Sequence, residues 1–402
     1  MVERFSDLSP PTRLLLGPGP SMVHPRVLRA MSTPLIGHLD PEFLKIMDEV
    51  QQMLRSLFRT RNAFTIPLSG TGSAGMEAAL VNIIEPNNAV IVGVNGVFGT
   101  RIATIVERCG GRAVRVNAPW GEIVDPRAIE DALKQHAPVK AVAVVHAETS
   151  TGVHQPLEDI GALCRQYHAL FIVDAVTSLG GLPLEVDRWN IDITYSGTQK
   201  CLSCPPGLAP LTVNERAMSV IRSRKSPCRS WYLDFSLIAD YWVSAKRAYH
   251  HTAPISMVYA LREALRVIHE EGLDARVRRH QLNSRALMAG LGALGFTPFA
   301  QEGARLTTLH CVVLPPAVDD TWARTALLHE FGIEIGAGLG PLHGKIWRIG
   351  LMGESSTRAA VWSLLGALDT LFLKQAWVDR SGLALEAASR TYNDMPNEHK
   401  SV

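Results

Sequence analysis

The sequence has little cysteine, few aromatic residues and no excess of charge of either sign. Its 402 residues include six cysteines, and aromatic side chains make up 6% of the chain. The formal net charge is +2, without the clustered lysine and arginine that nucleic-acid binding needs, so we expect no nucleic-acid partner. Sparse cysteines, with Cys109, Cys164 and Cys311 inside apolar segments, favour a reducing compartment.

Long apolar runs are also missing, because no stretch approaches the length of a membrane span. The first residues, MVERFSDLSPPTR, lack the apolar core of a signal peptide. The last residues, NDMPNEHKSV, carry no lipidation or organelle signal. We therefore expect no membrane partner and a cytoplasmic location.

The regular feature of the chain is an alternation of short apolar runs with helical periods between residues 63 and 214. This alternation predicts an α/β fold with a mainly parallel sheet covered by helices. The expected strands are 63–68, 88–96, 112–119, 140–148, 170–176, 191–197 and 208–214, and the expected helices are 73–86, 98–111, 126–136 and 157–168.

The pattern changes after about residue 255, where a helical period runs from Met257 past Gly272. Beyond it, strands are expected at 307–315, 333–338 and 345–351, with helices near 320–331 and 356–374. A second, smaller α/β domain follows from this change. The predicted division is an N-terminal arm (1–12), a large domain (13–272), a small C-terminal domain (273–378) and a loose polar tail (379–402).

The stretch SGTGSAG, residues 69–75, follows an expected strand and opens an expected helix. Its three glycines match G-x-G-x-x-G, a pattern in which the backbone approaches an anion at a helix N-terminus. A dinucleotide site also needs an acidic residue at the end of the next strand, where this chain has Asn95. The motif favours a phosphate site. A nicotinamide-dependent oxidoreductase using the Gly70–Gly75 loop, and a purely structural turn, stay open as alternatives.

Asp174 ends an almost wholly apolar strand, and Lys200 follows the next expected strand, between small residues and Pro-Pro-Gly. Taken separately, Asp174 could be a helix cap or an ion-pair partner, and Lys200 a solvated loop residue. However, ligands bind at the carboxyl ends of parallel strands, and a buried carboxylate is costly without a partner. Pyridoxal phosphate needs an anion site, an acid opposite its ring nitrogen and a lysine for a Schiff base, so the three features together suit this cofactor.

Many dispersed motifs, in the same order, resemble those of the class V aminotransferases, and most closely the alanine–glyoxylate and serine–pyruvate group. The likeness spans roughly residues 12 to 375. The motifs are LLLGPGPS (14–21), SGTGSAGMEAALVN, NGVFGTR, HAETSTGV (146–153), VDAVTSLGG, YSGTQK followed by PPG, YHHT (249–252) and IWRIGLMG.

The resemblance implies a fold-type I pyridoxal-phosphate enzyme. Such an enzyme has a large domain built on a mainly parallel sheet of the seven-stranded type, a smaller C-terminal α/β domain, and a homodimer with the cofactor near the subunit boundary. It implies that Lys200 forms the Schiff base and that Asp174 partners the pyridine nitrogen. The other implied roles are phosphate binding by Thr71, Gly72, Ser73 and Gln199, ring contacts by Phe98 and Thr149, phosphate contacts from the neighbouring subunit by Tyr249 and Thr252, and substrate binding by Gly19 and Arg348.

The implied activity is transfer of an amino group from alanine or serine to glyoxylate or pyruvate. Some relatives have Trp where Phe98 stands and His where Ser73 stands, and both replacements keep the stacking or hydrogen-bonding ability. A cysteine desulfurase-type lyase stays an alternative, but such enzymes usually carry His where this chain has Gln199. They also need a reactive cysteine on a mobile loop, whereas Cys311 lies in an apolar run.

Two further patterns are expected to be structural. Cys201 and Cys204 form C-x-x-C, but no thioredoxin-like context and no second zinc-type pair accompany them. The histidines of YHHT are adjacent, so they point apart, and no H-E-x-x-H motif appears. We therefore expect no metal site.

Overall fold

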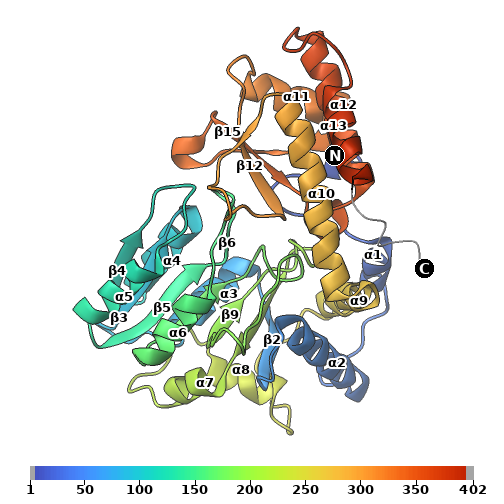
Figure 1. Ribbon diagram of the computed structural model, residues 1–402. Coiled ribbons are helices and arrows are strands. Elements are labelled where there is room, and N and C mark those ends of the chain that lie inside the picture. The colour runs from blue at the N-terminus through green and yellow to red at the C-terminus, as the bar shows by residue number, and fades with distance from the viewer. Residues whose placement is uncertain (1–4, 395–402) are drawn as a thin grey trace.

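A seven-stranded sheet forms the centre of the part of the molecule at the bottom of Figure 1, a computed structural model that describes residues 5–394. β10 runs antiparallel to its neighbours β2 and β9, and the other neighbouring pairs are parallel. The predicted mainly parallel sheet is therefore confirmed. In spatial order its strands are β2 (Phe64–Ser69), β10 (Leu208–Val213), β9 (Ile193–Tyr195), β8 (Leu170–Asp174), β5 (Val139–Val145), β3 (Ala89–Val94) and β4 (Arg112–Asn117).

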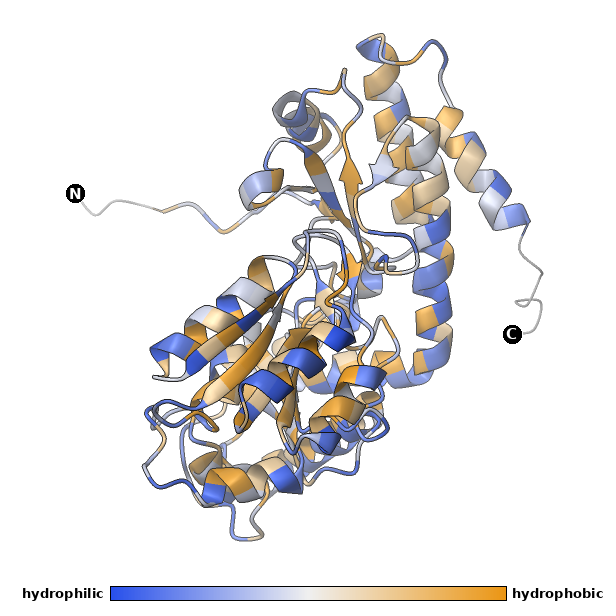
Figure 2. Cartoon of the chain, turned by 60° about the vertical axis from the view of Figure 1, so that its left-hand side comes forward, coloured by the Kyte–Doolittle hydropathy of each residue, from blue (hydrophilic) through white to orange (hydrophobic). Residues whose placement is uncertain are grey.

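Helices cover this sheet, and Figure 2 shows apolar strands inside and polar helix faces outside. Every residue of β2, β3, β8 and β10 is buried, as expected for strands covered on both faces. The helices of this part are α1 (Pro25–Met31), α2 (Pro41–Phe58), α3 (Gly72–Val81), α4 (Val97–Arg108), α5 (Pro126–Gln135), α6 (Glu158–Gln166), α7 (Glu215–Arg222), α8 (Phe235–Trp242) and α9 (Ile255–Glu271). A short hairpin, β6 (Ala147–Glu148) and β7 (Val153–His154), follows β5.

A second apolar core lies around a four-stranded sheet at the top of Figure 1. Its strands are β11 (Thr297–Pro298), β12 (Leu309–Val313), β15 (Ile346–Gly350) and β14 (Gly336–Ala337), with helices α10 (Leu273–Ala293), α11 (Asp320–Glu330), α12 (Arg358–Lys374) and α13 (Leu383–Asn393) and 3-10 turns η1 (Gly340–Leu342) and η2 (Gly353–Ser355).

The start of the chain packs with this second core. β1 (Leu14–Leu15) pairs in parallel with β13 (Ile333–Glu334), and Leu16 is fully buried in the second core. The segment then crosses to the first sheet, where Ser21 hydrogen-bonds the chain beside Lys200. The division of the chain at residue 272 stays a prediction.

Three expectations differ from the structure. The single strand expected at 333–338 is two strands, β13 and β14, which belong to different sheets. The helical period past Gly272 is broken there, because Gly272 has φ 81° and ψ 132° and separates α9 from α10. The loose tail is wrong for residues 383–393, which form α13 with Ala384 buried and the Tyr392 hydroxyl donating to Asn283 Oδ1 at 2.8 Å. The end of the predicted tail, residues 395–402, lies outside the described residues. Within residues 5–394, no helix is both long and apolar enough to cross a membrane.

Candidate active site

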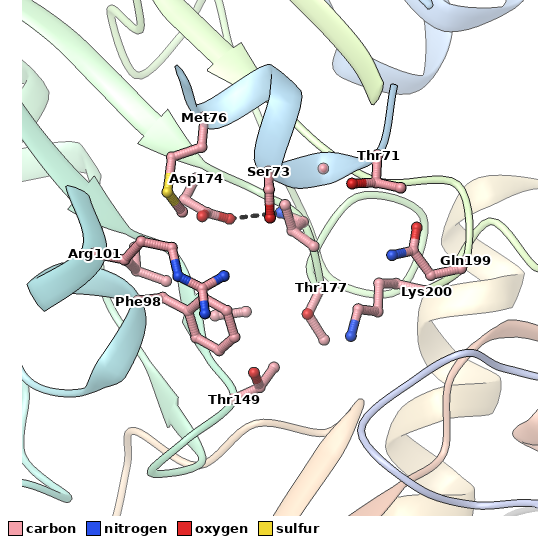
Figure 3. A pocket seen from close by; sticks show the side chains of 14 residues that line it. Thr71, Ser73, Met76, Phe98, Arg101, Thr149, Asp174, Thr177, Gln199 and Lys200 are labelled. Carbon is pink, nitrogen blue, oxygen red and sulfur yellow. Dashed lines mark hydrogen bonds between the residues drawn. The ribbon is translucent and has the colours of Figure 1, made fainter. Parts of the chain in front are cut away.

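A cavity of about 180 Å³ opens at the carboxyl ends of the parallel strands. Figure 3 shows Phe98, Arg101 and Thr149 on one side of it, and Gln199 and Lys200 on the other. The structure thus brings together most of the predicted cofactor residues. The lining residues are Thr71, Gly72, Ser73, Met76, Phe98, Arg101, Val145, Ala147, Thr149, Asp174, Val176, Thr177, Gln199 and Lys200.

Asp174, the last residue of β8, holds a buried carboxylate at the cavity wall. Its Oδ1 accepts from the Val176 backbone N–H at 2.9 Å, drawn as a dashed line in Figure 3, and its Oδ2 accepts from the Tyr195 hydroxyl at 3.1 Å. Burial raises the pKa of Asp174 to about 7 in spite of these two donors. The described residues place no cation within ion-pair distance of this carboxylate. The position therefore suits a ligand that brings a positive charge.

Lys200 carries its amine into the same cavity, on the turn after β9. The amine donates to the Pro18 carbonyl, and burial lowers its pKa to about 8. The N-terminal segment holds this turn, since Ser21 N donates to Gln199 O at 2.9 Å and Ser21 Oγ to Lys200 O at 2.8 Å.

Gly19 completes the wall beside the amine. Its φ is +116°, and a Cβ at this position would lie 2.6 Å from Lys200 Nζ. Any larger residue would therefore displace the amine.

The Gly70–Gly75 loop leads from β2 into α3, as the motif predicted. Gly70 has φ +135°, a conformation that side chains rarely adopt. Thr71 occupies the N-cap of α3 but makes no side-chain cap hydrogen bond, so the first N–H groups of the helix remain available to an anion. Thr71, Gly72 and Ser73 all border the cavity.

Gln199 faces the same anion site. Its Oε1 is buried and has no hydrogen-bond partner among the described residues. Such an unpaired buried atom is costly, and a ligand or ordered water would satisfy it.

Phe98 and Thr149 border the cavity from α4 and from the loop after β6. Glu148 positions Phe98, because its Oε2 accepts from the backbone N–H groups of Phe98 (3.0 Å) and Gly99 (3.2 Å). Its Oε1 accepts from the Ser150 hydroxyl at 2.5 Å. Burial raises the pKa of Glu148, which has no exposed surface.

Sequence reasoning missed four polar residues of this site, namely Tyr195, Glu148, Arg101 and Thr177. The Arg101 guanidinium lies 5.0 Å from the centre of the Phe98 ring, three residues further along α4. A signal for Arg101 was present, since residues three apart share a helix face. Tyr195 had no such signal, because its contact with Asp174 depends on the register of β8 and β9.

Arg348 lies on β15, outside the lining of the cavity but within electrostatic reach of Lys200. Its Nε donates to the Ala337 carbonyl at 2.7 Å, and burial lowers its pKa. In the described part of the chain it makes no ion pair. Its terminal nitrogens therefore remain available to a carboxylate.

Tyr249 and Thr252 are not brought to the cavity within this chain. The Tyr249 side chain is 58% exposed, and Thr252 borders a separate surface hollow together with Ser69 and Gly70. Contacts from these two residues to a phosphate in another subunit stay a prediction.

The C-x-x-C pair is buried. Burial raises the pKa of Cys201 to about 12 and also raises that of Cys204, and both are free thiols. Among residues 5–394, no group of three or more His, Cys, Asp or Glu side chains could hold a metal ion.

A half-buried amine, a buried carboxylate and a helix start with free N–H groups meet at one sheet edge. This arrangement fits the pyridoxal-phosphate enzymes of fold type I. The family model described as aminotransferase class-V matches residues 14–352. The chain belongs to this family and is a pyridoxal-phosphate-dependent aminotransferase.

Three similar proteins illustrate the relationship. The (S)-ureidoglycine–glyoxylate transaminase of Bacillus subtilis is 43% identical over 96% of this chain and 97% of its own. The alanine–glyoxylate aminotransferase of Callithrix jacchus is 43% identical over 89% of this chain and 87% of its own. The crystal structure of the ureidoglycine–glyoxylate aminotransferase from Bacillus subtilis matches with a TM-score of 0.94 at 44% identity, covering 97% of this chain and 100% of that one.

Proposed function

We propose that the chain transfers the amino group of a small amino acid to glyoxylate, with Lys200, Asp174 and Arg348 as the principal groups. The observation that carries this proposal is the half-buried Lys200 amine in one cavity with the buried Asp174 carboxylate. The glyoxylate in the names of both relatives supports the choice of acceptor. The donors named there are alanine and (S)-ureidoglycine, and serine is a further candidate from the sequence.

Thr71, Gly72, Ser73 and Gln199 would hold the cofactor phosphate, and Phe98 and Thr149 its ring. When bound, pyridoxal phosphate supplies a ring that stabilises negative charge on the substrate carbon. Asp174 would favour a protonated ring nitrogen, because a buried carboxylate gains from an adjacent positive charge.

Lys200, with a pKa of about 8, would be neutral often enough near pH 8 to take a proton from the substrate carbon and deliver it to the cofactor's aldehyde carbon. Arg348 would hold the carboxylate that the amino acid and glyoxylate share. A guanidinium pairs with a carboxylate through two parallel hydrogen bonds. The Nε bond to Ala337 holds the guanidinium and leaves its terminal nitrogens free for that carboxylate.

The test is a matrix of donors (alanine, serine, (S)-ureidoglycine) and acceptors (glyoxylate, pyruvate) on purified protein, with borohydride fixation of the cofactor. We expect glyoxylate to accept from at least one donor, and the fixed adduct to lie on the Lys200 peptide. Lys200→Ala should lose the adduct and about 10³-fold or more in rate. Lys345→Ala, at an exposed lysine, is the matched control and should keep both. Full activity in Lys200→Ala, or no transfer to glyoxylate from any donor, would contradict the proposal.

We further propose that the chain is a homodimer in which Tyr249 and Thr252 reach the phosphate of the partner. Trp231 is 62% exposed and Tyr249 is 58% exposed. Exposed aromatic side chains of this kind support a contact surface for a second subunit around these two residues. Light scattering should give twice the 43.9 kDa chain mass, and a monomer at micromolar concentration would contradict this. A cytoplasmic location stays a prediction.

A further inference from the structure

The two histidines of YHHT form a buried hydrogen-bond chain that the proposed reaction does not use. His250 Nε2 lies 3.2 Å from the Trp231 carbonyl oxygen, and its Nδ1 lies 2.7 Å from His251 Nδ1. His251 Nε2 then lies 2.8 Å from Ser69 Oγ. Each of these three side chains is at most 9% exposed. This hydrogen-bond chain therefore joins the end of β2 to the loop that carries Tyr249 and Thr252.

The direction of every bond in this chain follows from its first acceptor. A carbonyl oxygen can only accept, so His250 Nε2 donates, and in a neutral imidazole its Nδ1 must then accept. His251 Nδ1 donates to it, which leaves His251 Nε2 as the acceptor for the Ser69 hydroxyl. His251 remains neutral at ordinary pH, because burial and the neighbouring His250 lower its pKa to about 4. The groups that face it are His250, Ser69 and the rings of Tyr232 and Tyr241.

Aromatic packing fixes both imidazoles. Trp231 stacks on His250 with ring centres 4.4 Å apart, and Tyr232 lies 4.9 Å from the His251 ring. The rings cannot turn to other partners without losing these contacts, so the chain holds Ser69 in one rotamer.

Ser69 is the last residue before the phosphate cradle. Gly70 follows with φ +135°, its N–H donates to Gly207 O at 3.0 Å, and Thr71 and the start of α3 come next. Ser69, Gly70 and Thr252 also border the same surface hollow. A displaced Ser69 would therefore shift the backbone N–H groups that face the anion.

We propose that Ser69, His251 and His250 are positioning residues, which set the cofactor's phosphate cradle through this hydrogen-bond chain without touching the cofactor. The inference rests on the proposed cofactor site. It assigns a role to the two histidines that lie between Tyr249 and Thr252 in the YHHT motif, where the sequence alone indicates none.

The experiment compares the affinity of cofactor-free protein for pyridoxal phosphate and for pyridoxal, which lacks the phosphate. Ser69→Ala should weaken pyridoxal phosphate about tenfold, the effect of one buried hydrogen bond, and leave pyridoxal unchanged. Ser69→Thr keeps the hydroxyl and should restore the wild-type ratio of the two affinities. The matched control is Ser284→Ala, which removes another buried Ser–His bond of 2.7 Å, to His310, outside the cavity. It should change neither affinity.

The outcomes separate the inference from the function beneath it. Equal weakening of both ligands by Ser69→Ala, or weakening of neither, would overturn the positioning role. If Ser69→Ala does not fold, His251→Asn is measured in its place. It should likewise weaken the binding of pyridoxal phosphate and leave the binding of pyridoxal unchanged. Wild-type protein that binds neither ligand would instead overturn the proposed cofactor site.

Discussion

At the scale of single residues, Asp174 and Lys200 have pKa values shifted in opposite directions by the same cause. Burial raises the carboxyl to about 7 and lowers the amine to about 8. Each group is therefore in its neutral form over a wider range of pH than it would be in water. A site that must exchange protons with a substrate near neutral pH benefits from both shifts.

The Asp174 shift predicts a dependence of stability on pH. The native carboxyl, with a pKa of about 7 against an ordinary 3.8, holds more protons than the unfolded one between about pH 4 and 7. The unfolding free energy of cofactor-free protein therefore falls as pH rises through this window. Asp174→Asn removes the charge, so the variant should be more stable than wild type at pH 8 by roughly 4 kcal/mol, and by less than half of that at pH 5.

Urea unfolding of the cofactor-free proteins at both pH values measures this difference. Asp131→Asn, at an exposed aspartate, is the control and should change stability little at either pH. Equal unfolding free energies of Asp174→Asn and wild type at pH 8 would contradict the prediction, because the charged Asp174 carboxylate would then not destabilise the folded state.

Lys200 and Asp174 could be predicted because each follows an apolar strand, and strand ends of a parallel sheet meet at one edge. Tyr195 and Glu148 could not be placed in the same way. The Tyr195–Asp174 bond depends on the register of β8 and β9, in which these two residues are direct neighbours. Glu148 accepts a hydrogen bond from the start of α4, fifty residues earlier in the chain. No local sequence pattern predicts such a contact.

At the scale of elements, the joint between α9 and α10 depends on one glycine. Gly272 has φ 81° and ψ 132°, and no atom lies within 4 Å of an added Cβ. Gly272→Ala should therefore cost about 1–3 kcal/mol through backbone strain alone. Gly292→Ala, also without neighbours but inside α10, should stabilise by about 0.5–1 kcal/mol.

Thermal or urea unfolding of the two variants measures the contrast. The same sign of change in both would contradict the role of the joint. A helical period alone could not locate this break, since apolar spacing continues on both sides of Gly272 and only the backbone conformation differs.

α13 was mistaken for a tail for a related reason. Its buried positions are Ala384, Ala388 and Tyr392, two of which are small and give a weak apolar signal. The spacing of four residues was present in the sequence. These three residues belong to the second apolar core, in which α13 packs against α10.

At the scale of the whole molecule, Arg276 joins the second core to the turn that carries Lys200. From α10 it donates to Cys201 O at 2.9 Å and Gly180 O at 3.2 Å, and it pairs with Glu271 at 2.5 Å. The side chain is fully buried. Removal of Arg276 would leave the carbonyl oxygens of Cys201 and Gly180 and the Glu271 carboxylate without this hydrogen-bond donor.

Arg276→Met should therefore lower the unfolding free energy by about 3–5 kcal/mol. Arg278→Met, two residues along α10 and exposed, is the control and should stay within about 0.5 kcal/mol of wild type. Denaturant unfolding measures both. A loss in Arg276→Met no greater than in the control would contradict a linking role.

The two sheets could be predicted from the change in apolar pattern after residue 255. The place of the first residues could not, because Leu14–Leu16 join the second core through pairing with Ile333 and Glu334, near the other end of the chain. Pairing between such distant segments leaves no periodic trace in either one.

The crossing of this first segment, from β13 to the wall beside Lys200, has a consequence for biosynthesis. Pro18, Gly19 and Ser21 are synthesised long before β13, which anchors their segment, and long before the strand bearing Arg348. A nascent chain can build the first sheet and the phosphate loop during translation. The hold of this segment on the turn that carries Lys200 can therefore gain its support from β13 only after β13 has been made.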